Sequence, residues 1–443
     1  MSTAKQSASV FATRTSLIFV SLILSVIVNR MIGPQNRGVL ELLSTIPVLL
    51  VNIGNLGLGN ASLYFLGKRV YPERDIIANS ISSTFLVSGV IACCLCAAYV
   101  AFPQSLFGSV PTPYFLIVLL MIPLLLLSKV LYYILLGKGK IYLLNRLQVY
   151  SSLLGALLIL IFVALLRMDV LGVLLSTLIT TALVTLVYVV VTFENLPVIF
   201  FFSRKFFREA VRFGMVPFLA LAVMNLIFRS DVFLVKYFLS DIDLGYYGLG
   251  VSLCERIWIL PESIGLVILA KAAHSTDDES TSATARVCRM TLWLTAGGSA
   301  LLFILAPYLI PALYGTPFAP AILPLQILLP GIAMISVFLV LHSDLTGRGE
   351  AKCTLYVFLV FLILNVLMNI ILIPRMGIAG SALSSSVSYG GGAFVLAVVY
   401  ARKYQLRLKD LFFVNRDDWR QVVVPLFNKV LCAVRPASMA IKQ

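Results

Sequence analysis

Charged residues are scarce in this sequence. Asp, Glu, Lys and Arg together make up 12% of the 443 residues, whereas hydrophobic residues make up 60%. A water-soluble protein with this balance would have too little polar surface to cover itself. The composition therefore leaves no room for a soluble domain and predicts that lipid is the solvent for most of the chain.

Motifs for nucleotide, metal or hydrolytic chemistry are also missing. No Gly-x4-Gly-Lys-Ser/Thr loop is present, so the turn Gly137-Lys138-Gly139-Lys140 does not indicate an ATP site. The two histidines are far apart, and no acid pair accompanies a nucleophile. The seven cysteines lack the spacing of a zinc or redox motif, and packing is their expected role. We therefore expect no enzyme activity, no catalytic or metal-ligating residue and no cofactor.

What the sequence does contain is long apolar runs. About a dozen stretches approach the roughly 20 apolar residues that a spanning helix needs, and they are continuously apolar rather than alternating, which predicts helices and not a barrel. The predicted fold class is an all-α integral membrane protein. Its predicted spans are residues 9–31, 38–66, 76–102, 113–136, 142–166, 170–193, 213–239, 244–272, 287–313, 319–345, 351–374 and 378–401.

The net charge of +15 could indicate a nucleic-acid partner, but the placement of the basic residues argues against one. Alternate connections between spans are rich in Lys and Arg, as in 68–74, 138–146, 204–212, 271–289 and 348–352, whereas the other loops hold only Arg30, Arg37, Arg167 and Arg375. This asymmetry is the positive-inside rule, and it predicts that both termini are cytoplasmic. The first span ends without a small-x-small cleavage site and is predicted to be retained.

Two halves of the chain resemble each other when the sequence is shifted against itself. Leu136-Gly137-Lys138-Gly139-Lys140 matches Thr346-Gly347-Arg348-Gly349-Glu350 at a shift of 347 − 137 = 210 residues, and Arg167-Met168 matches Arg375-Met376 at 375 − 167 = 208 residues. Six spans per half predict two parallel bundles related by a pseudo-twofold axis, an arrangement that suits alternating access. The predicted organisation is a bundle at 1–193, an amphipathic linker at 194–212, a bundle at 213–401 and a basic amphipathic tail at 402–443.

Ionisable side chains inside the spans cost several kcal/mol unless they face a cavity or a partner, and each is a hypothesis for a functional site. They are Arg14, Glu41, Lys129, Arg229, Asp231, Glu255, Arg256, Glu262, His342 and Asp344. Because guanidinium groups bind phosphate oxygens in pairs, a cationic cavity for a pyrophosphate is one interpretation. Its predicted substrate-binding residues are Arg14, Lys129, Arg229 and Arg256.

Other interpretations of these charges stay open. Arg14 could extend to the membrane interface, and Arg229 with Asp231 could form ion pairs with Glu255 and Arg256. The carboxylates could instead bind a proton or a cation, and the candidates for ion coupling are Asp231, Glu255 and Glu262. His342 and Asp344, near the end of their span, are expected to be solvated. Gly54, Gly57 and Gly59 predict a hinge, a cavity lining or close helix packing.

The landmarks of the chain resemble those of the polysaccharide-flippase branch of the multidrug/oligosaccharidyl-lipid/polysaccharide (MOP) exporter superfamily, to which O-antigen and exopolysaccharide flippases belong. The resemblance extends over residues 10–401. It is carried by Asn29-Arg30-Met31-Ile32-Gly33-Pro34, Asn55-Leu56-Gly57-Leu58-Gly59-Asn60, Arg229-Ser230-Asp231, Gly347-Arg348-Gly349-Glu350 and Ile373-Pro374-Arg375-Met376-Gly377.

This resemblance implies two six-helix bundles around a cationic cavity that moves an undecaprenyl-pyrophosphate-linked oligosaccharide across the cell inner membrane without ATP hydrolysis. The implied partners are the lipid-linked oligosaccharide, membrane lipids, and a polysaccharide polymerase with glycosyltransferases; no nucleic acid is expected. Two other functions remain open. A multidrug antiporter of the same fold would need an acidic, aromatic cavity, and a non-transporting scaffold for glycosyltransferases would need no charge at the centre of the bilayer.

Overall fold

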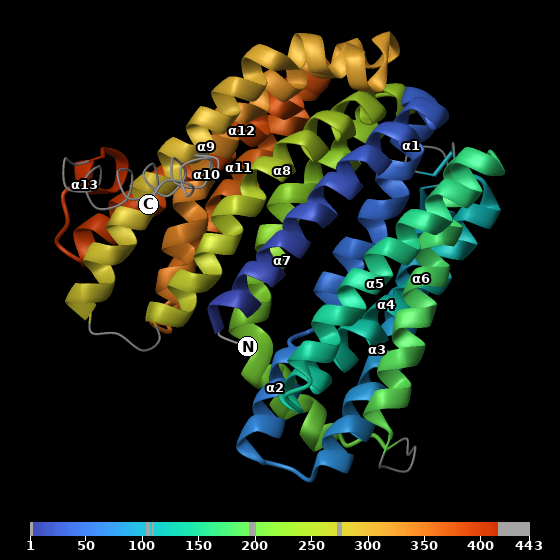
Figure 1. Ribbon diagram of the computed structural model, residues 1–443, viewed down its shortest axis with the longest axis vertical. Coiled ribbons are helices and arrows are strands. Elements are labelled where there is room, and N and C mark those ends of the chain that lie inside the picture. Colours follow the sequence, from blue (N-terminus) through green and yellow to red (C-terminus); the bar gives the residue numbers. More distant parts are fainter. Residues whose placement is uncertain (1–2, 103–106, 109, 195–200, 273–276, 415–443) are drawn as a thin grey trace, which may run out of the picture. The chain divides into compact units, whose positions relative to one another are not determined.

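The computed structural model describes residues 3–102, 107–108, 110–194, 201–272 and 277–414, and within these ranges the chain is helical with no strand. The predicted all-α membrane fold is therefore confirmed. The helices in chain order are α1 (Thr3–Gly54), α2 (Leu58–Lys68), α3 (Glu73–Ala101), α4 (Thr112–Gly137), α5 (Ile141–Ile159), η1 (Leu160–Leu165), α6 (Asp169–Thr192), α7 (Arg204–Phe238), α8 (Asp241–Ala272), α9 (Asp277–Tyr314), η2 (Thr316–Ala321), α10 (Ile322–Gly347), α11 (Ala351–Met376), α12 (Ile378–Lys403) and α13 (Lys409–Phe412) (Figure 1).

Ten helical segments in the described part of the chain are long and apolar enough to cross a membrane. One of them, Val20–Gly54, covers parts of the two predicted spans 9–31 and 38–66, and α8 is not among the ten. Counting α1 as two spans and adding α8 gives 10 + 1 + 1 = 12, which is the predicted number.

The first two predicted spans are joined without a loop. Gly33 is the single non-helical residue inside α1, with φ 72° and ψ 175°. Pro34 follows at the position where its fixed φ and missing N–H suit the first turn of a helix. Helix therefore resumes at once, and Arg37, which the sequence assigned to a loop, lies within α1.

A second break separates α1 from α2 inside the predicted span 38–66. Leu56 and Gly57 both have positive φ, 44° and 76°. The side chain of Asn55 accepts a hydrogen bond from the backbone N–H of Gly59 at 3.3 Å, which satisfies one donor at the start of α2. The glycine-rich sequence thus produces a discontinuous helix, which was one of the structures that the sequence left open.

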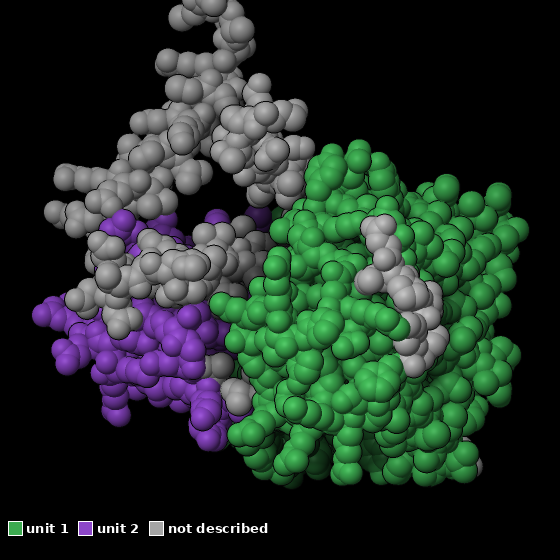
Figure 2. Space-filling view, turned by 90° about the horizontal axis from the view of Figure 1, so that it is seen from below, with its two compact units in different colours: residues 1–253, 305–328, 358–385 green, residues 254–304, 329–357, 386–443 purple. Residues whose placement is uncertain are grey.

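The helices form two compact units; the first takes segments from both halves of the sequence and the second from the second half (Figure 2). The first unit comprises residues 1–253, 305–328 and 358–385. Within it, α4 packs against α6, α2, α3 and α1, while α7 packs against α1 and α2. Aromatic rings reinforce the contact with α7: Phe65 and Tyr71 lie edge-on to Phe206, with ring centroids 5.6 Å and 5.5 Å away.

The second unit comprises residues 254–304, 329–357 and 386–443. It encloses the carboxylate of Asp344, which is 0% exposed. The hydroxyls of Thr284 (2.9 Å) and Tyr400 (2.8 Å) and the Nε of Arg348 (2.8 Å) donate hydrogen bonds to it. The expectation that Asp344 is solvated is wrong, because α9, α10 and α12 supply a full set of donors to it.

The tail after α12 is attached to this unit by hydrogen bonds from α9. Arg289 donates to the carbonyl of Asp410 and Trp293 to that of Phe412, each at 2.8 Å. Residues 415–443 of the predicted basic tail and 195–200 of the predicted linker lie outside the described residues, so the domain boundaries stay a prediction. The helix α7 begins at Arg204, with the Ser203 hydroxyl capping it through the N–H of Phe206.

Candidate functional site

A cluster of three charged side chains lies inside the first unit. The Nη2 of Arg37 is 2.5 Å from the Oε2 of Glu41, and the Nη1 of Arg229 is 3.7 Å from the other oxygen, Oε1. The side chains of Arg37 and Glu41 are 13% and 7% exposed, and that of Arg229 is 24% exposed. Two guanidinium groups therefore share one carboxylate.

The local sequence explains how this cluster forms. Arg37 and Glu41 are four residues apart on α1, so they lie on the same face of the helix. A Cβ atom at Gly248 of α8 would lie 2.8 Å from the Glu41 carboxylate, so only glycine leaves room for that side chain. Arg37 also donates to the backbone carbonyl of Gly248 at 3.4 Å. The helices α1, α7 and α8 thus meet at one buried carboxylate.

A second polar cluster surrounds Asp231, two residues after Arg229 on α7. The carboxylate, 1% exposed, accepts hydrogen bonds from the hydroxyl of Tyr247, from the hydroxyl of Ser385 at 3.3 Å and from the N–H of Val232 at 2.8 Å. Ser385 is in turn 3.3 Å from the amide of Asn365. Oxygen-rich side chains from α7, α8, α11 and α12 therefore meet around an enclosed carboxylate.

Lys129 faces a separate cavity of about 380 Å³ in the same unit. Its Nζ donates to the Oδ1 of Asn52 at 2.6 Å, and the Nδ2 of Asn52 donates to the Oδ1 of Asn225 at 2.8 Å. The cavity is lined by Val48, Val51, Asn52, Leu125, Ser128, Lys129, Tyr132 and Tyr188. Within the part of the chain that the structure describes, no carboxylate lies within ion-pair distance of this ammonium.

The other predicted site residues are distributed as follows. Arg14 lies in α1 and Glu262 in α8, but both side chains lie outside the described residues. Glu255 and Arg256 belong to the second unit, are partly buried, and each has interaction partners. Of the seven predicted residues, Lys129, Arg229 and Asp231 have described side chains in the first unit, where each is part of a polar cluster.

Several residues of these clusters were not predicted. Arg37 was assigned to a loop and Glu41 was given no role, although their spacing of four residues was a readable signal. The neutral residues Asn52, Tyr247 and Ser385 carry no local signal, because amides and hydroxyls are common in spanning helices and only contact with a charge distinguishes these. Their partners are 77, 16 and 154 residues away in the chain.

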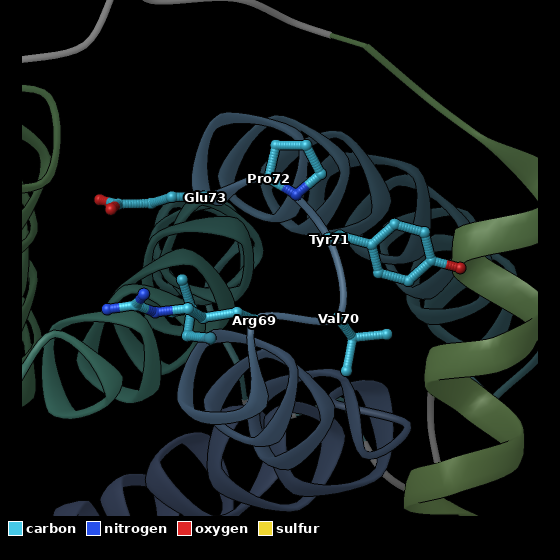
Figure 3. A pocket seen from close by; sticks show the side chains of 6 residues that line it. Arg69, Val70, Tyr71, Pro72 and Glu73 are labelled. Atoms are coloured by element: carbon cyan, nitrogen blue, oxygen red, sulfur yellow. The ribbon is translucent and has the colours of Figure 1, made fainter.

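A wider hollow of about 540 Å³ lies at the surface, at the turn between α2 and α3. Figure 3 shows the side chains of Arg69 and Glu73 pointing to one side of this turn and that of Tyr71 pointing to the other, toward α7. Glu73 forms an ion pair with Lys138 at 2.6 Å, and Tyr71 donates a hydrogen bond to Glu209. This bond to a carboxylate raises the pKa of Tyr71. The hollow therefore lies among paired charges that join α3 to α4 and the turn to α7.

The fold is that of the MOP superfamily of membrane transporters. A solved structure described as the lipid II flippase MurJ in an inward closed conformation matches with a TM-score of 0.72 at 15% identity, covering 96% of this chain and 98% of that chain. An inward-facing multidrug resistance MATE family transporter of the MOP superfamily matches with a TM-score of 0.62 at 15% identity, covering 88% and 94%. The eukaryotic MATE transporter AtDTX14 matches with a TM-score of 0.58 at 16% identity, covering 88% and 99%.

The chain belongs to the family described as polysaccharide biosynthesis proteins, whose model matches residues 5–268. A search of curated protein sequences finds no match. The predicted family resemblance is confirmed, and the solved structures with this fold are described as a flippase and as multidrug transporters. Together with the apolar helices, they indicate a multi-pass membrane protein with the fold of a transporter.

Proposed function

We propose that this protein flips an undecaprenyl-pyrophosphate-linked oligosaccharide, a repeat unit of O-antigen or exopolysaccharide, across the cell inner membrane by alternating access without ATP hydrolysis. Both termini are cytoplasmic in this proposal, as the loop charges predict. A polysaccharide polymerase and glycosyltransferases are the protein partners that such a function requires. Arg14, Lys129, Arg229 and Arg256 are the proposed cationic residues that contact the substrate.

The observation that carries the proposal is the convergence of two embedded guanidinium groups, Arg37 and Arg229, at Glu41. Embedded arginines are costly in a membrane protein and mark substrate pathways, so two of them at one carboxylate indicate a place for an anionic group. Arginine offers paired donors that match the oxygens of a phosphate group. A diphosphate bound at this cluster would accept hydrogen bonds from Arg37 and Arg229.

The experiment is complementation of a strain that lacks the protein, with surface polysaccharide as the readout. We expect Arg229→Ala and Arg256→Ala to abolish surface polysaccharide while protein level and membrane insertion stay normal. In Arg229→Ala the Glu41 carboxylate keeps its ion pair with Arg37, so no unpaired buried charge is created and we expect the variant to fold. Arg212→Ala, an exposed arginine on the same helix, is the matched control and should export normally. Undiminished polysaccharide in both cavity variants would refute the proposal.

A further inference from the structure

The cavity beside Lys129 differs in chemistry from the arginine cluster. The arginine cluster has a carboxylate at its centre, whereas the ammonium of Lys129 is held by an amide and faces two phenol rings. Lysine presents three donors, and in the described residues one of them has a protein acceptor, the Oδ1 of Asn52. The positive charge of Lys129 is therefore left for a ligand to compensate.

The orientation of the amides is fixed by the hydrogen bonds. Asn52 accepts from Lys129 with its oxygen, so its nitrogen must donate to Asn225, whose own nitrogen donates to the carbonyl of Leu221 at 2.7 Å. This series of hydrogen bonds holds the ammonium of Lys129 at the wall of the cavity. These hydrogen bonds end at the backbone carbonyl of Leu221. The position of the ammonium is therefore set by Asn52 on α1 and Asn225 on α7.

The distance between the two cationic sites excludes one diphosphate bridging both. Glu41 and Asn52 lie on the same helical segment of α1, 52 − 41 = 11 residues apart. At about 1.5 Å per residue they are separated by roughly 16 Å along the helix. A diphosphate is much shorter than this separation, so a cargo that occupies both sites at once must carry a second anionic group.

The lining indicates what that second group is attached to. Tyr132 is 40% exposed, and Ser128 and Asn52 line the same cavity. Rings with a polar tip, hydroxyls and amides suit a sugar, whose apolar face packs on a ring while its hydroxyls bond to polar groups. A lone ammonium acts as a point charge that needs no paired geometry, so it suits a single anionic group, such as the carboxylate that a sugar ring can carry.

We infer that the Lys129 cavity binds an acidic sugar residue of the cargo, with the sugar carboxylate on the ammonium of Lys129 and the ring against Tyr132. This inference rests on the proposed function, since it assigns a second part of the same cargo to a second part of the first unit. It also states a property of the substrate: the oligosaccharide contains a uronic acid or a comparable carboxylated sugar.

The test is calorimetric titration of the full-length protein in lipid nanodiscs with three probes. These are a soluble trisaccharide containing glucuronic acid, its methyl ester, and inorganic pyrophosphate. We expect the acid to bind about tenfold more tightly than the ester, a difference of about 1.4 kcal/mol. Lys129→Met should remove that preference and Lys129→Arg should keep most of it. Saturating pyrophosphate should leave binding of the acid unchanged.

Two further variants distinguish loss of the binding site from loss of the fold. Tyr132→Leu, at an exposed ring, should weaken the acid and the ester equally. Lys138→Met, at the end of the same helix, should leave both affinities as in the wild type, because Lys138 bonds to Glu73 and to the carbonyl of Thr192. Thermal unfolding of each variant would show that the cavity variants are folded.

The outcomes separate this inference from the proposed function. Equal affinity for acid and ester, or displacement of the acid by pyrophosphate, would overturn the sugar site and assign Lys129 to the diphosphate. Failure of pyrophosphate to bind the wild type would count against the proposed function itself. A third outcome is that pyrophosphate binds tightly to the wild type but not to Arg229→Ala, and that the acid is not preferred over the ester. This outcome would support the flippase proposal and refute the sugar site.

Discussion

At the scale of the residue, two buried carboxylates differ in how their charge is compensated. Asp344 has the guanidinium of Arg348 at 2.8 Å, whereas the three groups that hydrogen-bond to Asp231 are neutral, two hydroxyls and a backbone N–H, and the guanidinium of Arg229 attracts it without a hydrogen bond. A carboxylate paired with an arginine has its charge compensated inside the protein. One held by neutral donors is suited to gain and lose a proton or cation.

Asp231→Asn tests this difference. The amide keeps the size of the side chain but removes the negative charge, so we expect transport to lose its dependence on a proton or sodium gradient. The measurement is cargo flipping in proteoliposomes with and without an imposed gradient. Asp344→Asn is the matched control, and it should lower thermal stability because the buried ion pair with Arg348 is lost, while gradient dependence persists. Unchanged gradient dependence in Asp231→Asn would remove Asp231 from ion coupling.

At the scale of the element, the break between α1 and α2 depends on two glycines. A Cβ on Gly57 would lie 2.5 Å from the Cα of Gly214 in α7, and a Cβ on Gly214 would lie 2.6 Å from the Cα of Gly57. Gly57 also has a φ of +76°. The backbones of two spanning elements touch here, so a side chain at either position forces α7 away from α2.

Three alanine substitutions separate backbone strain from contact. Gly139→Ala adds only the strain of a positive φ, since φ is +75° and nothing lies within 4 Å, and should cost about 1–2 kcal/mol. Gly214→Ala adds only the contact and should cost about 1–3 kcal/mol. Gly57→Ala adds both. We therefore expect the melting temperatures in nanodiscs to fall furthest for Gly57→Ala, and a Gly214→Ala protein as stable as the wild type would contradict the close contact.

At the scale of the whole molecule, the two predicted repeats end with ion pairs of opposite polarity. Lys140, after α4, lies 3.1 Å from Glu194, after α6. The corresponding positions after α10 and at the end of α12 carry Glu350 and Lys403, which also form an ion pair. Exposed pairs contribute about 0–1 kcal/mol. Both repeats therefore have an ion pair at corresponding positions, but the basic and acidic residues of the pair are exchanged between them.

The predicted sidedness can be measured on single-cysteine variants in a background without the seven native cysteines. Lys68→Cys and Thr112→Cys are exposed positions that α3 separates. We expect an impermeant maleimide added to spheroplasts to label Thr112→Cys and to label Lys68→Cys only after lysis, because the basic turns are predicted to be cytoplasmic. The reverse pattern would invert the topology and, with it, the proposed direction of transport.

The sequence alone determined the number of spans, the all-helical class, the superfamily and a testable sidedness. Each of these depends on hydropathy, charge placement or motif order, which are local or nearly local properties of a chain in lipid. Boundaries were less accurate where glycine and proline act together: Gly33 and Pro34 were read as part of a loop, although helix resumes directly after them.

Only the tertiary structure decided which charges meet. Glu41 and Arg229 are 229 − 41 = 188 residues apart, yet their side chains lie 3.7 Å from each other, and no periodicity could pair them. The same holds for Asp231 with Ser385 and for Lys129 with Asn52. The sequence showed that these side chains are costly in lipid. Packing between distant helices determined whether each cost is offset by a carboxylate, by neutral donors or, as inferred for Lys129, by the cargo.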